Sequence, residues 1–84
     1  MIQERVGLRI KELRHKLGVS QEELAERADI HRTYIASLEV GKRNVSIVIL
    51  EKVVAALEVS LSEFFNFEEK LWEILNIQKM NETF

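Results

Sequence analysis

Apolar residues recur at helical spacings from the beginning of the chain. The first stripe consists of residues three or four positions apart, namely Val6, Ile10, Leu13 and Leu17. Residues spaced in this way share one face of an α-helix. The stripe therefore predicts a helix from about residue 3 to residue 17, which Gly18 ends because glycine readily adopts the left-handed conformation that closes a helix.

Two short helices are predicted next. Ser20 and Glu23 form a capping box, a pair that satisfies free backbone N–H groups at a helix start, and they open a helix at about 21–28. After a short turn, Ile35 and Leu38 lie on one face of a third helix at about 32–39, which Gly41 closes.

The rest of the chain continues the helical pattern. Ser46 is expected to cap a fourth helix with the inward face Ile47, Leu50, Val53, Val54 and Leu57. Ser60 and Glu63 form a second capping box, which opens a short fifth helix with Phe64 and Phe65, and residues 68–80 suit a sixth. Without any alternating strand pattern, the fold class is all-α. We expect a five-helix domain over 1–66 and a C-terminal extension over 67–84 that contributes to dimerisation, with a disordered tail end.

Composition narrows the class of protein. The 84 residues include 46% apolar and 31% charged residues and no proline, which is typical of one compact helical domain. With no cysteine and only two histidines, the chain lacks the ligands for a structural zinc site, and we expect neither a metal nor a cofactor nor a small-molecule ligand. No segment resembles a signal peptide or a membrane span, so we expect a cytoplasmic protein without a membrane partner.

The formal net charge of −2 does not by itself favour a nucleic-acid partner. Its distribution is uneven, however. Residues 1–50 hold nine basic and seven acidic residues, whereas residues 51–84 hold three and seven. A more basic first half and an acidic second half agree with a DNA-facing and a DNA-remote side, although ordinary solubility would explain the charges equally well.

The two short helices at 21–28 and 32–39 point to a specific chemistry. Neither can bury its apolar stripe alone, so both must pack on the first and fourth helices and leave a polar face outward. At the start of the third helix this face presents donors, a methyl group and a ring that suit base edges and phosphates, from Arg32, Thr33, Tyr34 and Ser37. Gln21 begins the second helix, where its amide and a backbone N–H suit a phosphate.

A family resemblance is carried by three motifs: Gly18-x-Ser20-Gln21-x-x-Leu24-Ala25, Ile35-x-x-Leu38-Glu39-x-Gly41-Lys42 and Leu57-x-Val59-x-x-x-x-Phe64. Over about residues 4 to 66 the chain resembles the phage repressor/Cro, or Xre-type, helix-turn-helix proteins. His31-Arg32-Thr33-Tyr34-Ile35 and Arg43-Asn44 resemble more narrowly the controller proteins of restriction-modification systems, which are dimers of similar length. The chain departs from the wider family in having Asp29 and Glu58 where glycine is usual.

The resemblance assigns roles to further residues. It places Lys42, Arg43 and Asn44 in a loop beside the recognition helix, the helix that enters the major groove, and so implies contacts to phosphates or the minor groove. It also implies an ion pair between Arg14 and Glu39 that ties the first helix to the third. The loop residues are thus expected to bind DNA, and the ion pair is expected to stabilise the fold. No residue is a catalytic candidate.

Apolar residues beyond the needs of the core predict a homodimer. Val48 and Ile49 must point partly away from the inward face of the fourth helix, and the extension adds Phe67, Leu71 and Trp72. A two-fold dimer would place two recognition helices about one turn of DNA apart, or ~34 Å, and would fit an inverted-repeat operator.

The function that we expect is a sequence-specific transcriptional regulator of the controller type, with double-stranded DNA and a second copy of the chain as partners. Two alternatives remain open at this point: the antitoxin of a toxin–antitoxin pair, and a protein-interaction module of the same fold that does not bind DNA. An enzyme ranks last, because the carboxylates are scattered over outward helical positions with no activated nucleophile or paired acid and base.

Overall fold

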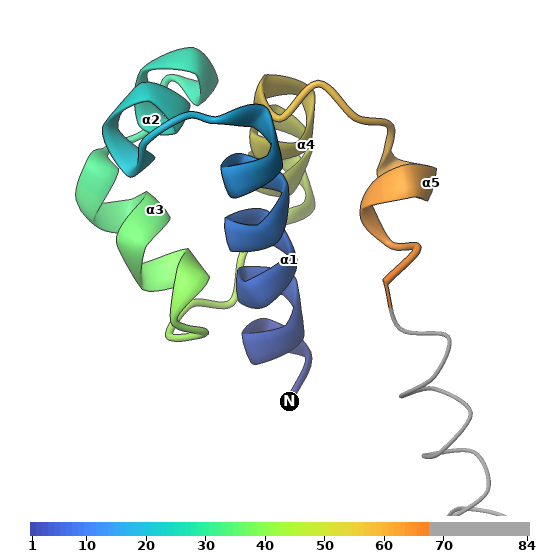
Figure 1. Cartoon of the computed structure of the whole chain (residues 1–84). Coiled ribbons are helices and arrows are strands. Elements are labelled where there is room, and N and C mark those ends of the chain that lie inside the picture. Colours follow the sequence, from blue (N-terminus) through green and yellow to red (C-terminus); the bar gives the residue numbers. More distant parts are fainter. Residues whose placement is uncertain (68–84) are drawn as a thin grey trace, which may run out of the picture.

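The computed structural model describes residues 1–67, which form five α-helices in the order shown in Figure 1. Their bounds are α1 (Ile2–Leu17), α2 (Gln21–Ala28), α3 (Arg32–Glu39), α4 (Ile47–Ala56) and α5 (Leu61–Phe64). The predicted bounds of the first three helices are confirmed to within one residue, and the all-α class is confirmed. The sixth helix predicted over 68–80 lies outside the described residues. Within residues 1–67, no helix has the length and apolar character needed to cross a membrane.

Serine side chains cap the starts of α2, α4 and α5. The hydroxyl oxygens of Ser20, Ser46 and Ser60 accept hydrogen bonds from the backbone N–H three residues on, at 3.0, 3.1 and 3.0 Å. Each bond satisfies one of the N–H groups that a helix start leaves without a partner, and replacing such a cap usually costs about 1 kcal/mol. All three caps were predicted from the sequence and are confirmed.

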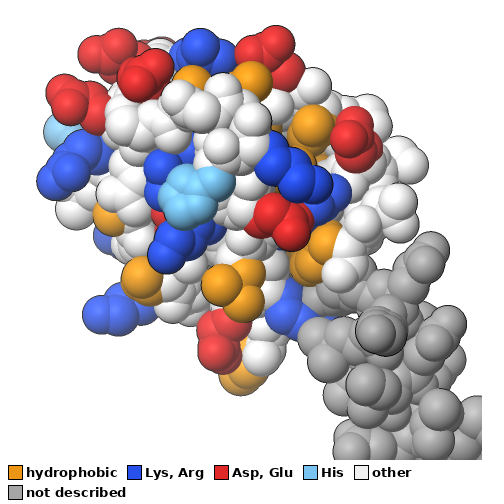
Figure 2. Space-filling view, viewed as in Figure 1, with side chains coloured by type: hydrophobic (Ala, Val, Ile, Leu, Met, Phe, Trp, Pro, Cys, Tyr) orange, Lys and Arg blue, Asp and Glu red, His pale blue; other side chains and the backbone are white. Residues whose placement is uncertain are grey.

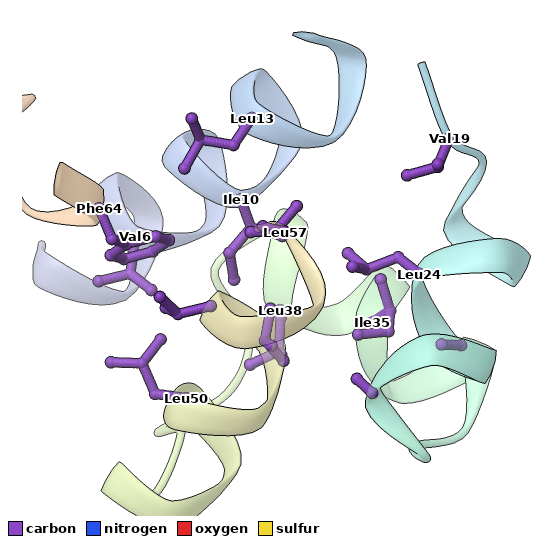
Figure 3. Packing of buried hydrophobic residues seen from close by; sticks show 14 residues of the cluster. Val6, Ile10, Leu13, Val19, Leu24, Ile35, Leu38, Leu50, Leu57 and Phe64 are labelled. Carbon is purple, nitrogen blue, oxygen red and sulfur yellow. The ribbon is translucent and has the colours of Figure 1, made fainter. Parts of the chain in front are cut away.

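The core lies where α1, α2, α3 and α4 meet, with α5 closing one end. Ile10, Leu24, Ile35, Val53 and Phe64 are its largest fully buried side chains. Figure 3 shows the side chains of Ile10, Leu38 and Leu57 pointing toward one another between α1, α3 and α4. Full burial of a side chain of this size contributes roughly 1.5–3 kcal/mol, so this apolar centre holds the short helices in place.

The prediction that Ile47 of α4 faces inward is wrong. Leu50, Val53, Val54 and Leu57 are buried, but Ile47 is 84% exposed. Helical spacing puts it on the same stripe, yet it is the first residue of α4, and the core lies under the later turns of the helix. Ile49, by contrast, is half-buried and packs against the core, so it points outward less than expected.

Two turns adopt the left-handed conformation without glycine. Asp29 has φ 55° and Glu58 has φ 63°, a region that side-chain-bearing residues enter only at a cost in energy. The turns therefore keep the expected shape even though the glycines usual in the resembled family are absent. The Glu58 carboxylate also accepts a hydrogen bond from Arg27 at 3.1 Å, between two exposed side chains.

Gly7 brings α1 against the end of α3. A Cβ atom at this position would lie 2.2 Å from the carbonyl oxygen of Leu38 and 2.8 Å from that of Glu39, distances that no real side chain tolerates. Only glycine lets the two backbones approach so closely. The crossing fixes the position of α3 on α1. It lies at the C-terminal end of α3 and not at its first turn.

A buried arginine that the sequence patterns did not indicate holds α5. Arg9 is 9% exposed and donates from Nε to the Phe64 carbonyl at 2.8 Å and from Nη2 to the Glu63 carbonyl at 2.7 Å, while Nη1 pairs with Glu12. The carbonyls at a helix end have no partner within the helix, and a cation there is favourable. Arg9 thus joins α1 to the end of α5.

Candidate nucleic-acid interface

The first turn of α3 presents its polar side chains to solvent. Arg32 and Thr33 are exposed and Tyr34 is half-buried, whereas Ile35 and Leu38 on the opposite face are buried in the core. Only three residues join α2 to α3, so the two helices form one compact unit, on the side of the molecule away from α5 (Figure 1). The predicted helix-turn-helix geometry is therefore present, with its polar face outward.

A buried ion pair fixes the other end of α3. Arg14 donates from Nε to Glu39 Oε2 at 2.7 Å and from Nη2 to Oε1 at 3.1 Å, and its Nη1 donates to the Val19 carbonyl at 3.0 Å. Arg14 is 8% and Glu39 5% exposed. Such two-point pairing fixes direction as well as distance. The pair implied by the family resemblance is confirmed.

Gln21 belongs to the same polar network. Its side-chain amide donates to Glu39 Oε1 at 3.1 Å, and the residue is half-buried. An amide has two N–H groups, so one remains for another acceptor. The start of α2 also has backbone N–H groups beyond the one that Ser20 accepts, and these suit a phosphate. The contact with Glu39 was not predicted, because the two residues are 18 positions apart.

The loop between α3 and α4 brings Arg43 back onto α3. The Arg43 guanidinium lies 5.1 Å from the centre of the Tyr34 ring, and its Nε donates to the Ser37 hydroxyl at 3.1 Å. The Ser37 hydroxyl in turn donates to the Tyr34 carbonyl at 2.7 Å. Three of the predicted DNA-contacting residues therefore form one cluster, which no sequence pattern indicated.

The other predicted loop residues are placed apart from this cluster. Lys42 is exposed, and Asn44 accepts a hydrogen bond at its amide oxygen from Gln3 of α1. Asn44 therefore links the loop to α1, while its amide nitrogen remains available as a donor. The structure tests none of the proposed DNA contacts, so these residues stay predictions.

Acidic side chains flank the candidate interface on its α2 side. Glu22, Glu26 and Asp29 line an open pocket of about 420 Å³ together with Arg32. Figure 2 shows acidic groups gathered at the upper left, where Figure 1 places α2. These three carboxylates would repel phosphates from the pocket itself, so a nucleic acid would approach from the side of α3 and the following loop. Within residues 1–67, no cluster of three or more acidic or histidine side chains could hold a metal ion.

The residues predicted for a dimer interface divide into three groups. Val48 is 66% exposed beside the exposed Ile47, whereas Ile49 is half-buried. Phe67 is half-buried, with its ring 6.0 Å from that of Phe64 and 5.7 Å from the Arg9 guanidinium. Leu71 and Trp72 lie outside the described residues. The dimer contacts therefore stay a prediction, with the start of α4 as its exposed part.

Comparison with known proteins supports the helix-turn-helix assignment. A family model described as helix-turn-helix matches residues 10–64. The control protein C.MunI from a Mycoplasma species is 51% identical over 67 residues, which are 79% of this chain and 90% of that protein.

Two solved structures of restriction-modification controller proteins are also similar. C.AhdI from Aeromonas hydrophila has a TM-score of 0.72 at 40% identity, covering 75% of this chain and 96% of that one. C.Esp1396I, a tetramer in complex with its natural 35-base-pair operator, has a TM-score of 0.74 at 38% identity, covering 77% of this chain and 86% of that one.

Proposed function

This chain belongs to the helix-turn-helix family, and from that premise we propose that it is a sequence-specific DNA-binding regulator of transcription, of the restriction-modification controller class. Its similarity extends over most of the length of a control protein and of a controller of known structure. We propose no catalytic role, because a regulator of this family acts by binding. For such a protein the site of action is the compartment that holds the DNA, which in bacteria is the cytoplasm.

One observation carries the proposal: α3 is anchored at its buried end and exposed at its polar start. The Arg14–Glu39 pair and the contact at Gly7 hold Glu39 and Leu38 against α1. Arg32 and Thr33 are then presented from a helix whose direction is fixed. A rigid helix with exposed donors at its N-terminal end is what reading base edges in the major groove requires.

The proposed contacts fall into two kinds. Arg32 and Thr33 are placed to contact base edges, with Tyr34 beside them for a thymine methyl, a sugar or a phosphate. The remaining predicted contacts come from Gln21 and from the loop residues Lys42, Arg43 and Asn44. These are proposed to contact the DNA backbone, which positions the protein without reading sequence. Ser37 was predicted as a contact as well, but its hydroxyl bonds within the protein, to the Tyr34 carbonyl and to Arg43.

The proposed active unit is a homodimer on an inverted repeat. Ile47 and Val48 form an exposed apolar pair at the start of α4 that a second copy would cover. Val48→Glu is the suitable test, since Ile49 also packs on the core and its replacement would disturb folding. We expect a folded variant that sediments as a monomer and binds an inverted repeat more weakly. A wild-type monomer at tens of micromolar, ~10⁻⁵ M and far above specific operator affinities, would contradict the dimer.

The binding function is tested by titrating the wild-type protein with the duplex upstream of its own gene and with a random duplex, at two salt concentrations. We expect tighter binding to the upstream duplex and a steep loss of affinity with salt, because contacts to phosphates release counterions. Binding to neither duplex would overturn the proposal. It would then favour a protein-interaction module, for which the net charge of −2 and the acidic side chains of α2 are the supporting observations.

An antitoxin of this fold would also bind DNA, so a different experiment is needed to distinguish it from a controller. An antitoxin must bind a toxin, so co-expression with the products of the neighbouring genes would recover a stable complex and neutralise a toxic partner. A controller instead changes transcription of a restriction gene. The controller assignment predicts that a reporter under that promoter responds to the protein.

A further inference from the structure

Arg43 lies in the loop after α3, yet its side chain is held by two residues of the helix. Its guanidinium lies 5.1 Å from the Tyr34 ring centre, within the range of a cation–π contact. Its Nε donates to Ser37 at 3.1 Å. The side chain is thereby held at two points, by the Tyr34 ring and by the Ser37 hydroxyl, although the residue itself is exposed.

The Ser37 hydroxyl is engaged within the protein once as a donor and once as an acceptor. Its hydroxyl has one hydrogen to donate, which goes to the Tyr34 carbonyl at 2.7 Å, and it accepts from Arg43. It therefore has no hydrogen left to donate to a DNA base or phosphate. Its position on α3 is better explained by what it does to Arg43 than by a contact of its own.

The remaining edge of the guanidinium is the one that suits a phosphate. With Nε occupied, the two terminal nitrogens of Arg43 carry four N–H groups, and among residues 1–67 no hydrogen bond to a protein acceptor is found for them. Two parallel N–H groups at this edge match two oxygens of a phosphate. The edge that suits a phosphate therefore has no protein acceptor in this part of the chain, while Nε is held by Ser37.

We propose that Ser37 and the ring of Tyr34 are positioning residues that hold Arg43 in advance for a two-point contact with a DNA backbone phosphate beside the groove entered by α3. The proposal rests on the DNA-binding function given above and deepens it. Its physical advantage is entropic, because ordering a long side chain on binding costs the equivalent of about a 2- to 12-fold loss in affinity. In this chain the Arg43 side chain is already ordered when the protein folds, so DNA binding does not carry this cost.

The first experiment examines the free, full-length protein by NMR. Protons of the Arg43 side chain close to the Tyr34 ring should be shifted upfield by the ring current. Tyr34→Phe keeps the ring and should keep the shift, whereas Tyr34→Leu should abolish it. Shifts of the wild-type Arg43 side chain typical of an unstructured peptide would overturn the proposal without any reference to DNA.

The second experiment is a double-mutant cycle in DNA affinity with Ser37→Ala and Arg43→Ala, using the upstream duplex and a random duplex. Ser37→Ala should weaken binding to both by about 2- to 12-fold when Arg43 is present and have no effect when Arg43 is alanine. An equal loss in both backgrounds would overturn the proposal and make Ser37 a direct contact. Helix stability is not at risk, because alanine favours a helix more than serine does.

Salt dependence separates positioning from contact. Arg43→Ala should reduce the slope of log affinity against log salt by about 0.9, the value for one phosphate contact, whereas Ser37→Ala should leave the slope unchanged. A reduced slope for Ser37→Ala would contradict the positioning role. If the wild-type protein binds neither duplex, the DNA-binding function itself fails, which the NMR measurement on the free protein distinguishes from a failure of the Arg43 contacts.

Discussion

The two ends of α3 differ in how far their polar side chains are held by the rest of the protein. At its C-terminal end, Glu39 is 5% exposed and shares its carboxylate between Arg14 and Gln21. At its N-terminal end, Arg32 and Thr33 are exposed, and His31 forms no side-chain cap. A helix of eight residues therefore carries a buried, paired carboxylate at one end and exposed polar side chains at the other.

This difference explains how a helix of eight residues can read DNA. An isolated helix of that length is unstable in water, because its few hydrogen bonds do not compensate for the cost of nucleation. Anchoring one end on α1 supplies the missing stability and fixes the axis of the helix. At the other end, Arg32 and Thr33 are exposed and remain available for DNA. Stability and recognition are thus assigned to opposite ends of one element, and substitutions should separate them.

The largest expected effect follows from breaking the anchor. Arg14→Ala or Glu39→Ala leaves one buried charge without its partner, which typically costs about 3–5 kcal/mol of unfolding free energy. The double variant should cost less than the sum, because no charge is then left alone. Urea denaturation of the four proteins measures the coupling. Additive losses would mean that the two charges do not stabilise α3 as a pair.

A second way to break the anchor acts on the backbone contact. Gly7→Ala places a Cβ within 2.2 Å of the Leu38 carbonyl, so α1 and α3 must separate, and overpacking of this kind costs about 1–3 kcal/mol. The matched control is Gly18→Ala, where nothing lies within 4 Å and only the left-handed backbone opposes the change, at roughly 1–2 kcal/mol.

The two glycine variants should also differ in DNA binding. Gly7→Ala shifts α3 and should weaken specific binding in the protein that remains folded, whereas Gly18→Ala should leave affinity unchanged. Loss of affinity in both, measured by titration under conditions where circular dichroism shows a folded chain, would contradict the anchoring role of Gly7.

Much of the fold was accessible from the sequence because its signals are local. Three serine caps and the glycine ends set the bounds of the helices, and each depends on residues within four positions. Ile47 was assigned to the core wrongly, since periodicity gives the face of a residue and not whether the core extends beneath that turn. The Arg14–Glu39 pair came from family resemblance and not from spacing.

The site was accessible only in part. Sequence placed Arg32 and Thr33 at the start of the recognition helix, where the structure has them exposed. It did not indicate that Arg43 folds back onto Tyr34, or that Gln21 bonds to Glu39, because both contacts depend on tertiary packing. Arg9 was missed for a related reason: its partners are the backbone carbonyls of α5, which carry no sequence signal.

At the open end of α3, substitutions should change binding and leave stability nearly intact. Arg32→Ala and Thr33→Ala should each remove about 1–3 kcal/mol of discrimination between specific and random DNA, the usual value of a base contact. Unfolding free energies should stay within about 0.5 kcal/mol of the wild type, as for other surface changes.

Arg43→Ala and Gln21→Ala serve as the comparison within the binding surface. Contacts to phosphates carry no sequence information, so these two variants should weaken binding to specific and random duplexes alike. Equal losses on both duplexes for all four variants would contradict the assignment of Arg32 and Thr33 to bases.

The smallest expected effect concerns the turn that leads into α3. Asp29 has φ 55° and joins the acidic side of α2 to the first turn of the recognition helix. Asp29→Gly removes the strain of a left-handed aspartate but adds the entropy of glycine to the unfolded chain, about 0.5–1 kcal/mol, so the two effects nearly cancel. We expect a change in unfolding free energy below about 1 kcal/mol. Glu58→Gly, at φ 63° in a turn remote from α3, should behave similarly and controls for the backbone effect.

DNA affinity then separates the charge of Asp29 from its conformation. Asp29→Asn removes the negative charge while keeping a residue that tolerates the left-handed region, and it should tighten binding to specific and random duplexes modestly because one repulsion with phosphate is lost. Asp29→Gly should match it if charge alone matters. A loss of specific binding in Asp29→Gly, with Asp29→Asn unaffected, would show that the turn as well as the buried end directs α3. In that case α3 would be held at both ends, by the turn at Asp29 as well as by the pair at Glu39.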